Sequence, residues 1–312
     1  MSISLPSSAR QSLPARLAAF LDLIKFAHTI FALPFAMLAA TMATAAIGWS
    51  WRRAAIQFAL ILACMFAART FAMTVNRLAD RAFDRRNPRT ARRPSVTGVV
   101  SLRFMWSVTA ACALLFAAAT FLFLVLLHNP WPSLLASPVL FWIGLYSFTK
   151  RFTALCHFFL GISLGLAPVS AWIAIAPPNA PFLTPAAALL GLAVTFWVAG
   201  FDILYALQDE AIDRQEGLHS IPAALGRRKA IWVSRGCHLL AAAALAAVGL
   251  TGQFGPLYWT GAALAAILLV VEQWLVSPED ISKINIAFMT VNGIVGIVFG
   301  GLAIGDVVWR MR

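Results

Sequence analysis

Two stretches of the chain bring acidic side chains together at intervals of four residues. The first contains Asn76, Asp80 and Asp84, and the second contains Asp209 and Asp213. On a helix this interval places side chains on one face, one turn apart. The separation from Asp80 to Asp209 equals that from Asp84 to Asp213, 129 residues in each case. We interpret this equal separation as a sign of two related halves of the chain that meet at a common site.

Paired carboxylates of this kind suit a hard divalent cation. Mg²⁺ takes a few carboxylate oxygens and completes its octahedron with water and phosphate oxygens. Arginines crowd around the first pair, and Arg and Lys side chains bind further phosphate oxygens. Metal and guanidinium groups together stabilise the charge that builds on a departing diphosphate. The sequence therefore predicts two aspartate pairs that hold Mg²⁺ and the diphosphate of a substrate.

Most of the remaining chain is apolar. Of its 312 residues, 61% are hydrophobic and 12% are charged, and the mean hydropathy is +0.82. This composition is typical of an integral membrane protein. The net charge of +12 falls in short loops between apolar segments, so we expect no nucleic-acid partner. A site at the edge of a lipid bilayer suits a diphosphate head with a long apolar tail, which is a polyprenyl diphosphate.

Apolar runs of about 20 residues, long enough to cross a bilayer, predict nine transmembrane helices. Their expected ranges are 26–48, 54–75, 103–127, 132–149, 153–176, 184–208, 229–250, 256–276 and 284–308. Residues 1–25 are expected to form a cytoplasmic N-terminal tail. We expect residues 26–308 to form a single transmembrane domain, because no polar stretch is long enough to build a second core.

Lys and Arg residues are strongly biased to one side of this predicted topology. With the N-terminus inside, the loops after even-numbered spans hold the arginines of residues 77–103, the pair Lys150 and Arg151, and Lys283. The other side keeps only Arg52, Arg53, Arg310 and Arg312. Because positively charged loops stay in the cytoplasm, we expect a multi-pass protein of the cell inner (plasma) membrane with its site facing the cytoplasm.

Four motifs resemble the UbiA superfamily of intramembrane prenyltransferases. Its first signature is similar to Asn76, Asp80, Asp84, Arg89 and Arg93, and its second to Tyr205, Asp209, Asp213, Gly217 and Ser220. Residues 146–151 resemble its Tyr-Pro-x-x-Lys-Arg stretch, with Ser147 in place of the proline. Residues 24–36 resemble the 4-hydroxybenzoate polyprenyltransferase-like branch.

The resemblance implies nine helices around a central cavity with cytoplasmic capping loops, and transfer of a polyprenyl group to an aromatic ring. By motif position, Mg²⁺ would be held by Asp80, Asp84, Asp209 and Asp213, with Asn76 in support. The diphosphate would be contacted by Arg89, Arg93 and Lys150. Arg151 would contact either the diphosphate or a carboxylate of the acceptor. Tyr205 would line the ring site, and Asp202 is the candidate acceptor of the ring proton. Ser220 belongs to the substrate site, and Lys25 either contacts substrate or snorkels to the membrane interface.

Two questions stay open at this point. The acceptor is 4-hydroxybenzoate, for ubiquinone biosynthesis, or a dihydroxynaphthoate-type ring in the futalosine route to menaquinone. A function of another class is transport of an anionic lipid or metabolite, which predicts polar groups at mid-membrane in broken helices. The acidic pairs lie at one membrane edge, and this arrangement favours an enzyme.

Overall fold

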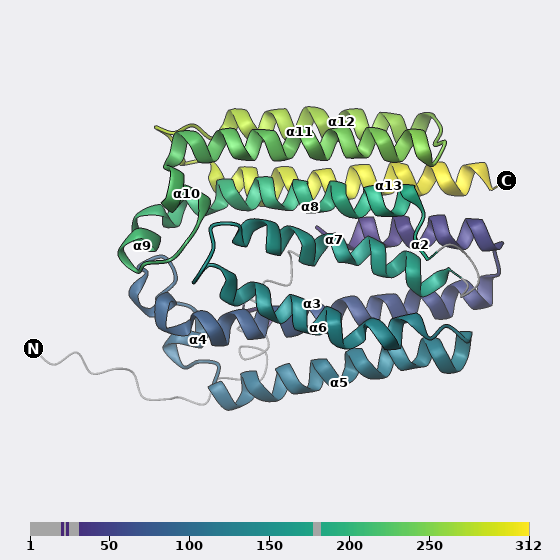
Figure 1. Ribbon diagram of the computed structural model, residues 1–312, viewed down its shortest axis with the longest axis horizontal. Coiled ribbons are helices and arrows are strands. Elements are labelled where there is room, and N and C mark those ends of the chain that lie inside the picture. Colours follow the sequence, from purple (N-terminus) through teal and green to yellow (C-terminus); the bar gives the residue numbers. More distant parts are fainter. Residues whose placement is uncertain (1–19, 22, 25–30, 177–181, 312) are drawn as a thin grey trace, which may run out of the picture.

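Long helices run side by side through the whole molecule (Figure 1). The computed structural model describes residues 20, 21, 23, 24, 31–176 and 182–311, and within these residues every regular element is helical. Eight of the described helices are long and apolar enough to cross a membrane. This confirms the predicted all-α, multi-pass membrane fold.

The eight long helices account for most of the predicted spans. They are α3 (Trp51–Arg86), α5 (Leu102–Leu127), α6 (Trp131–Thr149), α7 (Cys156–Ile175), α8 (Pro185–Ala206), α11 (Arg227–Thr251), α12 (Pro256–Leu275) and α13 (Asn292–Arg310). A π-helix, η3 (Ile286–Val291), leads into α13. α2 (Leu33–Ile47) is shorter, and the predicted first span begins in residues outside the described part, so the count of nine is not confirmed.

Helix α3 carries the first acidic stretch beyond the apolar layer. Its 36 residues span about 54 Å at 1.5 Å per residue, whereas the hydrocarbon core of a bilayer is about 30 Å thick. The last turns, which contain Asp80 and Asp84, therefore continue the helix past the predicted end of the span at residue 75. A single rigid element thus fixes the depth of both carboxylates.

Short helices gather at one end of the bundle. They are α4 (Pro94–Thr97), η2 (Leu207–Asp209), α9 (Glu210–Gln215) and α10 (Ile221–Leu225). Figure 1 shows α4, α9 and α10 together at the end opposite the C-terminus. Ser220 caps α10, since its hydroxyl oxygen accepts a hydrogen bond from the backbone nitrogen of Ala223 at 3.3 Å. These segments form the capping loops that the family resemblance implied.

The described end of the predicted N-terminal tail packs against this body. Phe20 meets Phe104 edge-on, with ring centroids 5.6 Å apart. Arg77 Nε donates a hydrogen bond to the carbonyl oxygen of Leu23 at 3.1 Å. Phe20 and Leu23 therefore contact α5 and α3, respectively. Most of the predicted tail falls outside the described residues.

An aromatic cluster forms the centre of the core and joins α2, α8 and η3. Phe35 lies 5.1 Å from Trp197 between ring centroids, and Phe31 lies 5.4 Å from Phe201 and 5.5 Å from Phe288. Aromatic pairs at such distances add to the free energy gained by burial alone. The cluster ends at the functional pocket described below, because Phe288 also packs against Tyr205.

A buried polar network lies beside this cluster and joins α8, α12 and α13. The indole Nε1 of Trp197 donates a hydrogen bond to Asn292 Oδ1 at 2.6 Å, and Asn292 Nδ2 donates one to Glu272 Oε1 at 2.8 Å. All three residues are buried. In a membrane interior, hydrogen bonds between helices take the place of bonds to water. Asn292 therefore joins α8, α12 and α13 through buried hydrogen bonds.

Asn292→Leu is expected to lower the free energy of unfolding by about 2 kcal/mol, because the buried Trp197 N–H and Glu272 Oε1 each lose their hydrogen bond to Asn292. Thermal unfolding of the detergent-solubilised protein would show a lower midpoint. Ile294→Ala is the matched control, since Ile294 on the same helix is 42% exposed and its loss should shift the midpoint little. Equal midpoints for Asn292→Leu and the unsubstituted protein would contradict a fastening role.

Candidate active site

A polar pocket opens at the end of the bundle that carries the short helices. Among the sequence-predicted site residues, its lining contains Asn76, Asp80, Asp84, Arg89, Arg93, Lys150, Asp202, Tyr205, Asp209, Asp213 and Ser220. They come from the end of α3, the loop that follows it, the end of α6, and the segment from α8 to α10. The pocket thus brings the two acidic stretches together, as their spacing predicted.

Asp80 lies at the centre of the α3 stripe. Lys150 Nζ approaches its Oδ2 at 2.9 Å, and Asn76 Nδ2 donates a hydrogen bond to the same oxygen at 3.2 Å. Arg77 Nη1 donates to the amide oxygen of Asn76 at 3.2 Å, which fixes the orientation of that amide. Asp80 Oδ1 is buried and has no hydrogen-bond partner among the described residues. A buried carboxylate oxygen in this state has a strong requirement for a donor or a cation.

Asp84 is paired with an arginine from the loop that follows α3. Arg93 Nη1 donates to both carboxylate oxygens of Asp84, at 2.7 and 2.8 Å. The Thr90 hydroxyl donates to the backbone carbonyl of Asp84 at 3.0 Å. This second bond folds the loop back on the helix end and so holds Arg93 over the pocket.

Asp209 from the second stretch is paired with Arg89 from the first. Arg89 Nε donates to Asp209 Oδ1 at 3.0 Å, and its Nη2 makes a closer contact with Oδ2. Asn87 Nδ2 also donates to Oδ1 at 2.9 Å, and Arg89 Nη1 donates to the Tyr205 hydroxyl at 3.2 Å. Burial works to lower the pKa of Arg89, but the bond and attraction to Asp209 outweigh it and raise the pKa. The guanidinium therefore stays charged and ties the two halves together.

Two further aspartates, Asp202 and Asp213, also line the pocket. Burial raises the pKa of the Asp213 carboxyl, and its backbone carbonyl accepts a hydrogen bond from Leu218 N at 2.8 Å. Asp202 Oδ2 lies 2.7 Å from His157 Nδ1. Asp202 is thus held by a histidine that the sequence did not place in the site.

Two predicted residues are missing from this description of the pocket, for different reasons. Lys25 lies outside the described residues. Arg151 is absent from the pocket lining, since its Nη2 donates to the carbonyl oxygen of Ala79 at 2.7 Å and its guanidinium lies 4.9 Å from the centroid of the Phe148 ring. In this arrangement Arg151 fastens the end of α6 to α3, and a catalytic role for it stays a prediction.

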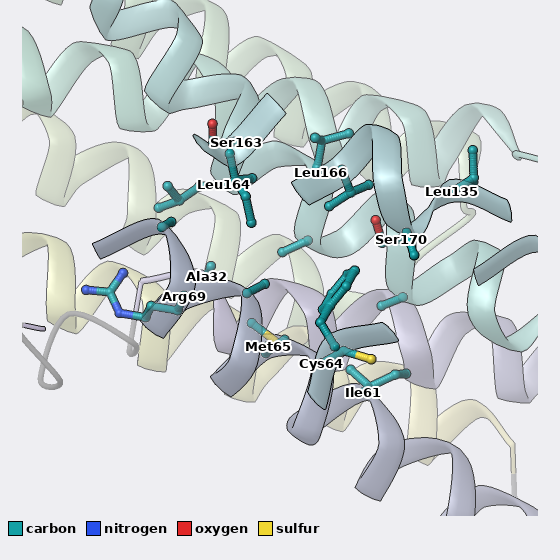
Figure 2. Close-up of a pocket in the computed structure, with 18 of the residues that line it drawn as sticks. Ala32, Ile61, Cys64, Met65, Arg69, Leu135, Ser163, Leu164, Leu166 and Ser170 are labelled. Atoms are coloured by element: carbon teal, nitrogen blue, oxygen red, sulfur yellow. The ribbon is translucent and has the colours of Figure 1, made fainter. Parts of the chain in front are cut away.

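A second, apolar pocket adjoins the polar one. Figure 2 shows its wall, with Ile61, Cys64 and Met65 of α3 facing Leu164 and Leu166 of α7. The residues that line both pockets are Arg69, Met73, Tyr146, Leu160 and Leu164. The polar pocket therefore adjoins an apolar pocket within the bundle.

A model of the UbiA prenyltransferase family matches residues 32–294. The chain belongs to this family. Among curated proteins, the 4-hydroxybenzoate octaprenyltransferase of Aromatoleum aromaticum is 31% identical over 237 residues, which cover 76% of this chain and 77% of that protein. The 4-hydroxybenzoate octaprenyltransferase of Nitrosomonas europaea is 33% identical over 246 residues, 78% of this chain and 79% of that protein. The predicted family and the prediction of a prenyltransferase are confirmed.

Solved structures show the same fold. The apo structure of a UbiA homolog from Aeropyrum pernix K1 has a TM-score of 0.78 and 32% identity, covering 89% of this chain and 98% of that chain. A UbiA homolog from Archaeoglobus fulgidus bound to DMAPP and Mg²⁺ has a TM-score of 0.68 and 20% identity, covering 93% of this chain and 99% of that chain. At the lower identity the likeness concerns the fold alone.

The residues of this UbiA-family site fit a hard divalent cation in type, because they supply carboxylate oxygens from several aspartates of one pocket. The four motif aspartates, Asp80, Asp84, Asp209 and Asp213, line one pocket, and Asp80 Oδ1 is a buried oxygen without a hydrogen-bond partner in the described part. As the side chains stand, no group of three described His, Cys, Asp or Glu residues is arranged to hold one ion. The physical reason is pairing, because Lys150, Arg93 and Arg89 each neutralise one aspartate. Oxygen donors suit the ion, and the three cations suit a phosphate.

Arg69 and His157 are site residues that sequence reasoning missed in this UbiA-family protein. Arg69 was counted within an apolar span, although a charged residue inside such a span normally faces a cavity or a partner. It lies seven residues before Asn76, which is about 10 Å deeper along the helix. His157 carried no neighbouring ligand in sequence, so no local pattern could have identified it.

Proposed function

We propose that this protein transfers a polyprenyl group from a polyprenyl diphosphate to 4-hydroxybenzoate, forming 3-polyprenyl-4-hydroxybenzoate for ubiquinone biosynthesis. One observation carries the proposal: the polar pocket that contains the four motif aspartates shares Arg69 and Met73 with an adjoining apolar pocket. A diphosphate head suits the first pocket and an isoprenoid chain suits the second. The names of the curated relatives support the acceptor, and the Archaeoglobus neighbour bound to DMAPP and Mg²⁺ supports the donor and the metal.

Asp80, Asp84, Asp209 and Asp213 would hold Mg²⁺, and Asn76 would orient Asp80 through its hydrogen bond. When bound, Mg²⁺ supplies positive charge that stabilises the departing diphosphate. The chain's own cations act beside it. When the substrate binds, its phosphate oxygens replace the aspartates as partners of Lys150, Arg89 and Arg93. Arg binds phosphate in a planar fork, and Lys binds it as a point charge.

Electrostatic stabilisation of the negative charge that develops on the leaving diphosphate lowers the barrier to the reaction. The allylic carbon–oxygen bond breaks, and its electron pair leaves with the diphosphate. The ring carbon beside the hydroxyl attacks the allylic carbon, and the ring loses a proton. Tyr205 and Phe288, whose centroids are 4.2 Å apart, form an aromatic wall of the pocket, and Asp202 on the same lining is the proposed proton acceptor.

Arg69 gives the acceptor its orientation in this proposal. Arg69 lines both the apolar and the polar pocket, and Figure 2 shows its guanidinium toward one end of the apolar pocket. A charged fork at this depth pairs with a carboxylate bidentately and holds the opposite, hydroxyl-bearing end of the ring toward the polar pocket. This favours a benzoate or naphthoate over a phenol without a carboxylate.

The orientation of the protein follows from its charge distribution. The pocket end carries the arginines of residues 77–103 together with Lys150 and Arg151. Positively charged loops near membrane spans remain in the cytoplasm. We therefore place residues 26–308, as one domain, in the cell inner (plasma) membrane with the pocket open to the cytoplasm.

An acceptor panel tests this function. Membranes that contain the protein, supplied with Mg²⁺, a polyprenyl diphosphate and labelled 4-hydroxybenzoate, are expected to form a lipid-soluble aromatic product. Membranes with the Asp80→Asn variant give the background. Product from a dihydroxynaphthoate alone would assign the enzyme to menaquinone synthesis. No product with any phenolic acid or naphthoate, together with uptake of intact diphosphate into vesicles, would replace the enzyme by a transporter.

A further inference from the structure

His157 occupies a position between the pocket and the capping segment. It is the second residue of α7 and is 3% exposed. Its Nδ1 lies 2.7 Å from Asp202 Oδ2, and the backbone N–H of Ile221 donates a hydrogen bond to its Nε2 at 3.2 Å. One imidazole therefore joins an acid of the pocket to the first turn of α10.

These two contacts determine which nitrogen of the His157 imidazole carries the hydrogen. The backbone N–H of Ile221 is a donor only, so Nε2 must offer a lone pair. In that tautomer Nδ1 carries the hydrogen and donates it to Asp202 Oδ2. His157 cannot accept a second proton without losing the bond to Ile221, so it serves as an anchor and not as a relay.

Close packing of two helices holds this pair in place. Gly161, one turn after His157, lies against α8, and a Cβ added there would stand 2.3 Å from the carbonyl oxygen of Thr195. Small residues allow helices in membranes to approach in this way. The α8 segment in contact leads, two turns later, to Asp202. The distance between the imidazole and the carboxylate is therefore set by packing.

The capping segment is fastened at the same place. His219 N donates to the carbonyl oxygen of Lys150 at 2.6 Å, and the Cys156 thiol contacts the carbonyl oxygen of His219 at 3.4 Å. With the Ile221 bond, these contacts hold the start of α10 against the junction of α6 and α7. An N–H at a helix start needs a partner outside the helix, and for Ile221 that partner is His157.

We propose that His157 is a positioning residue for prenyl transfer, which rests on the function proposed above. By holding Oδ2, it turns Asp202 Oδ1 toward the pocket to accept the ring proton. The contact with His157 uses Asp202 Oδ2, and the Asp202 side chain is 24% exposed and lines the pocket. In the reaction, a new bond forms between the allylic carbon and the ring carbon, and the diphosphate leaves with the electron pair of the broken carbon–oxygen bond. The proton on that ring carbon then passes to Asp202. The electron pair of the broken carbon–hydrogen bond restores the aromatic ring.

The test compares His157→Leu with His157→Asn, using acceptor with hydrogen or deuterium beside the hydroxyl. Leu removes both polar contacts, whereas Asn places an amide N–H where the imidazole Nδ1–H stands. For His157→Leu we expect kcat to fall about 10- to 100-fold, KM for both substrates to change little, and the deuterium isotope effect on kcat to rise to about 2 or more, because proton removal becomes limiting. His157→Asn should recover much of kcat and return the isotope effect toward that of the unsubstituted protein.

Several outcomes would overturn this role. An unchanged isotope effect in both variants would make His157 a structural residue only, and a rise in acceptor KM without loss of kcat would make it a binding residue. If His157→Leu does not fold, His157→Gln takes its place, because its amide extends toward the Nε2 position and leaves Asp202 Oδ2 without the Nδ1–H donor. A raised isotope effect in His157→Gln with a near-normal one in His157→Asn supports positioning, and equal isotope effects in these two variants overturn it. Product formation by the unsubstituted protein tests the proposed function separately, and its absence would overturn both.

Discussion

Asp80→Asn and Asp209→Asn are each expected to lower the kcat of prenyl transfer about 1,000-fold. Asparagine keeps the size of the side chain but removes the negative charge that a divalent cation requires. Loss of one preorganised electrostatic contact to a reacting group costs about 100- to 1,000-fold in rate, and a metal ligand lies at the upper end of that range. Single-turnover product formation over a range of Mg²⁺ concentrations would measure the loss and show whether more Mg²⁺ partly restores the rate.

The fold should survive both substitutions, because an asparagine side chain can still accept hydrogen bonds from Lys150 and Arg89. Thermal unfolding in detergent would check this. Asp280→Asn is the matched control, since Asp280 is exposed and its Oδ1 only accepts a turn bond from Ser282 N at 2.9 Å. We expect it to leave turnover nearly unchanged. Near-normal turnover of Asp80→Asn or Asp209→Asn would mean that the metal assignment is wrong.

Arg69→Leu is expected to raise KM for 4-hydroxybenzoate about 100-fold, with a smaller effect on KM for the polyprenyl diphosphate. The reason is that a charge-assisted, bidentate bond to a carboxylate in low-dielectric surroundings is among the strongest polar contacts. Arg69→Lys keeps the charge but not the planar fork, so its KM for 4-hydroxybenzoate should lie between that of the unsubstituted protein and that of Arg69→Leu. Initial rates over a range of acceptor concentrations would give these values.

The role of Arg69 can be separated from a general disturbance of the pocket. An acceptor in which a methyl group replaces the carboxylate should be used poorly by the unsubstituted protein, and Arg69→Leu should use both acceptors about equally. Arg103→Leu is a matched control, since Arg103 is exposed and lies outside both pocket linings. If Arg69→Leu still prefers the carboxylate to the same degree, another group binds it.

The four-residue spacing of Asn76, Asp80 and Asp84 was enough to predict that these side chains share one face of a helix end, whereas Asp209 ends a 3₁₀-helix and Asp213 lies in the following short helix. Both stretches line the polar pocket, and the roles of their residues stay predictions. Helical geometry places side chains at this interval on one face whatever their neighbours are, and α3 shows that face as a continuous helix end. Sequence also separated apolar spans from basic loops, because the bilayer imposes length and composition on each span. The predicted count of nine depended on the first span, part of which falls outside the described residues.

Pairing between distant segments could not be predicted in this way. Arg151 stood beside Lys150 in the same motif, yet Lys150 reaches Asp80 while Arg151 turns back to the carbonyl of Ala79. Adjacent residues on a helix end point in different directions, so their partners depend on what packs on each side. His157 joined the site for the same reason, through the close contact between α7 and α8 at Gly161.

The sequence by itself determined that this is a membrane-embedded, all-helical protein with two aspartate pairs suited to a metal and a diphosphate. Those properties follow from local spacing and from the composition of each span. Only the tertiary structure decided which cation neutralises which aspartate, that Arg69 stands where the polar and apolar pockets meet, and that His157 holds Asp202. These features depend on how helices far apart in the chain pack together, and no interval within one segment contains that information.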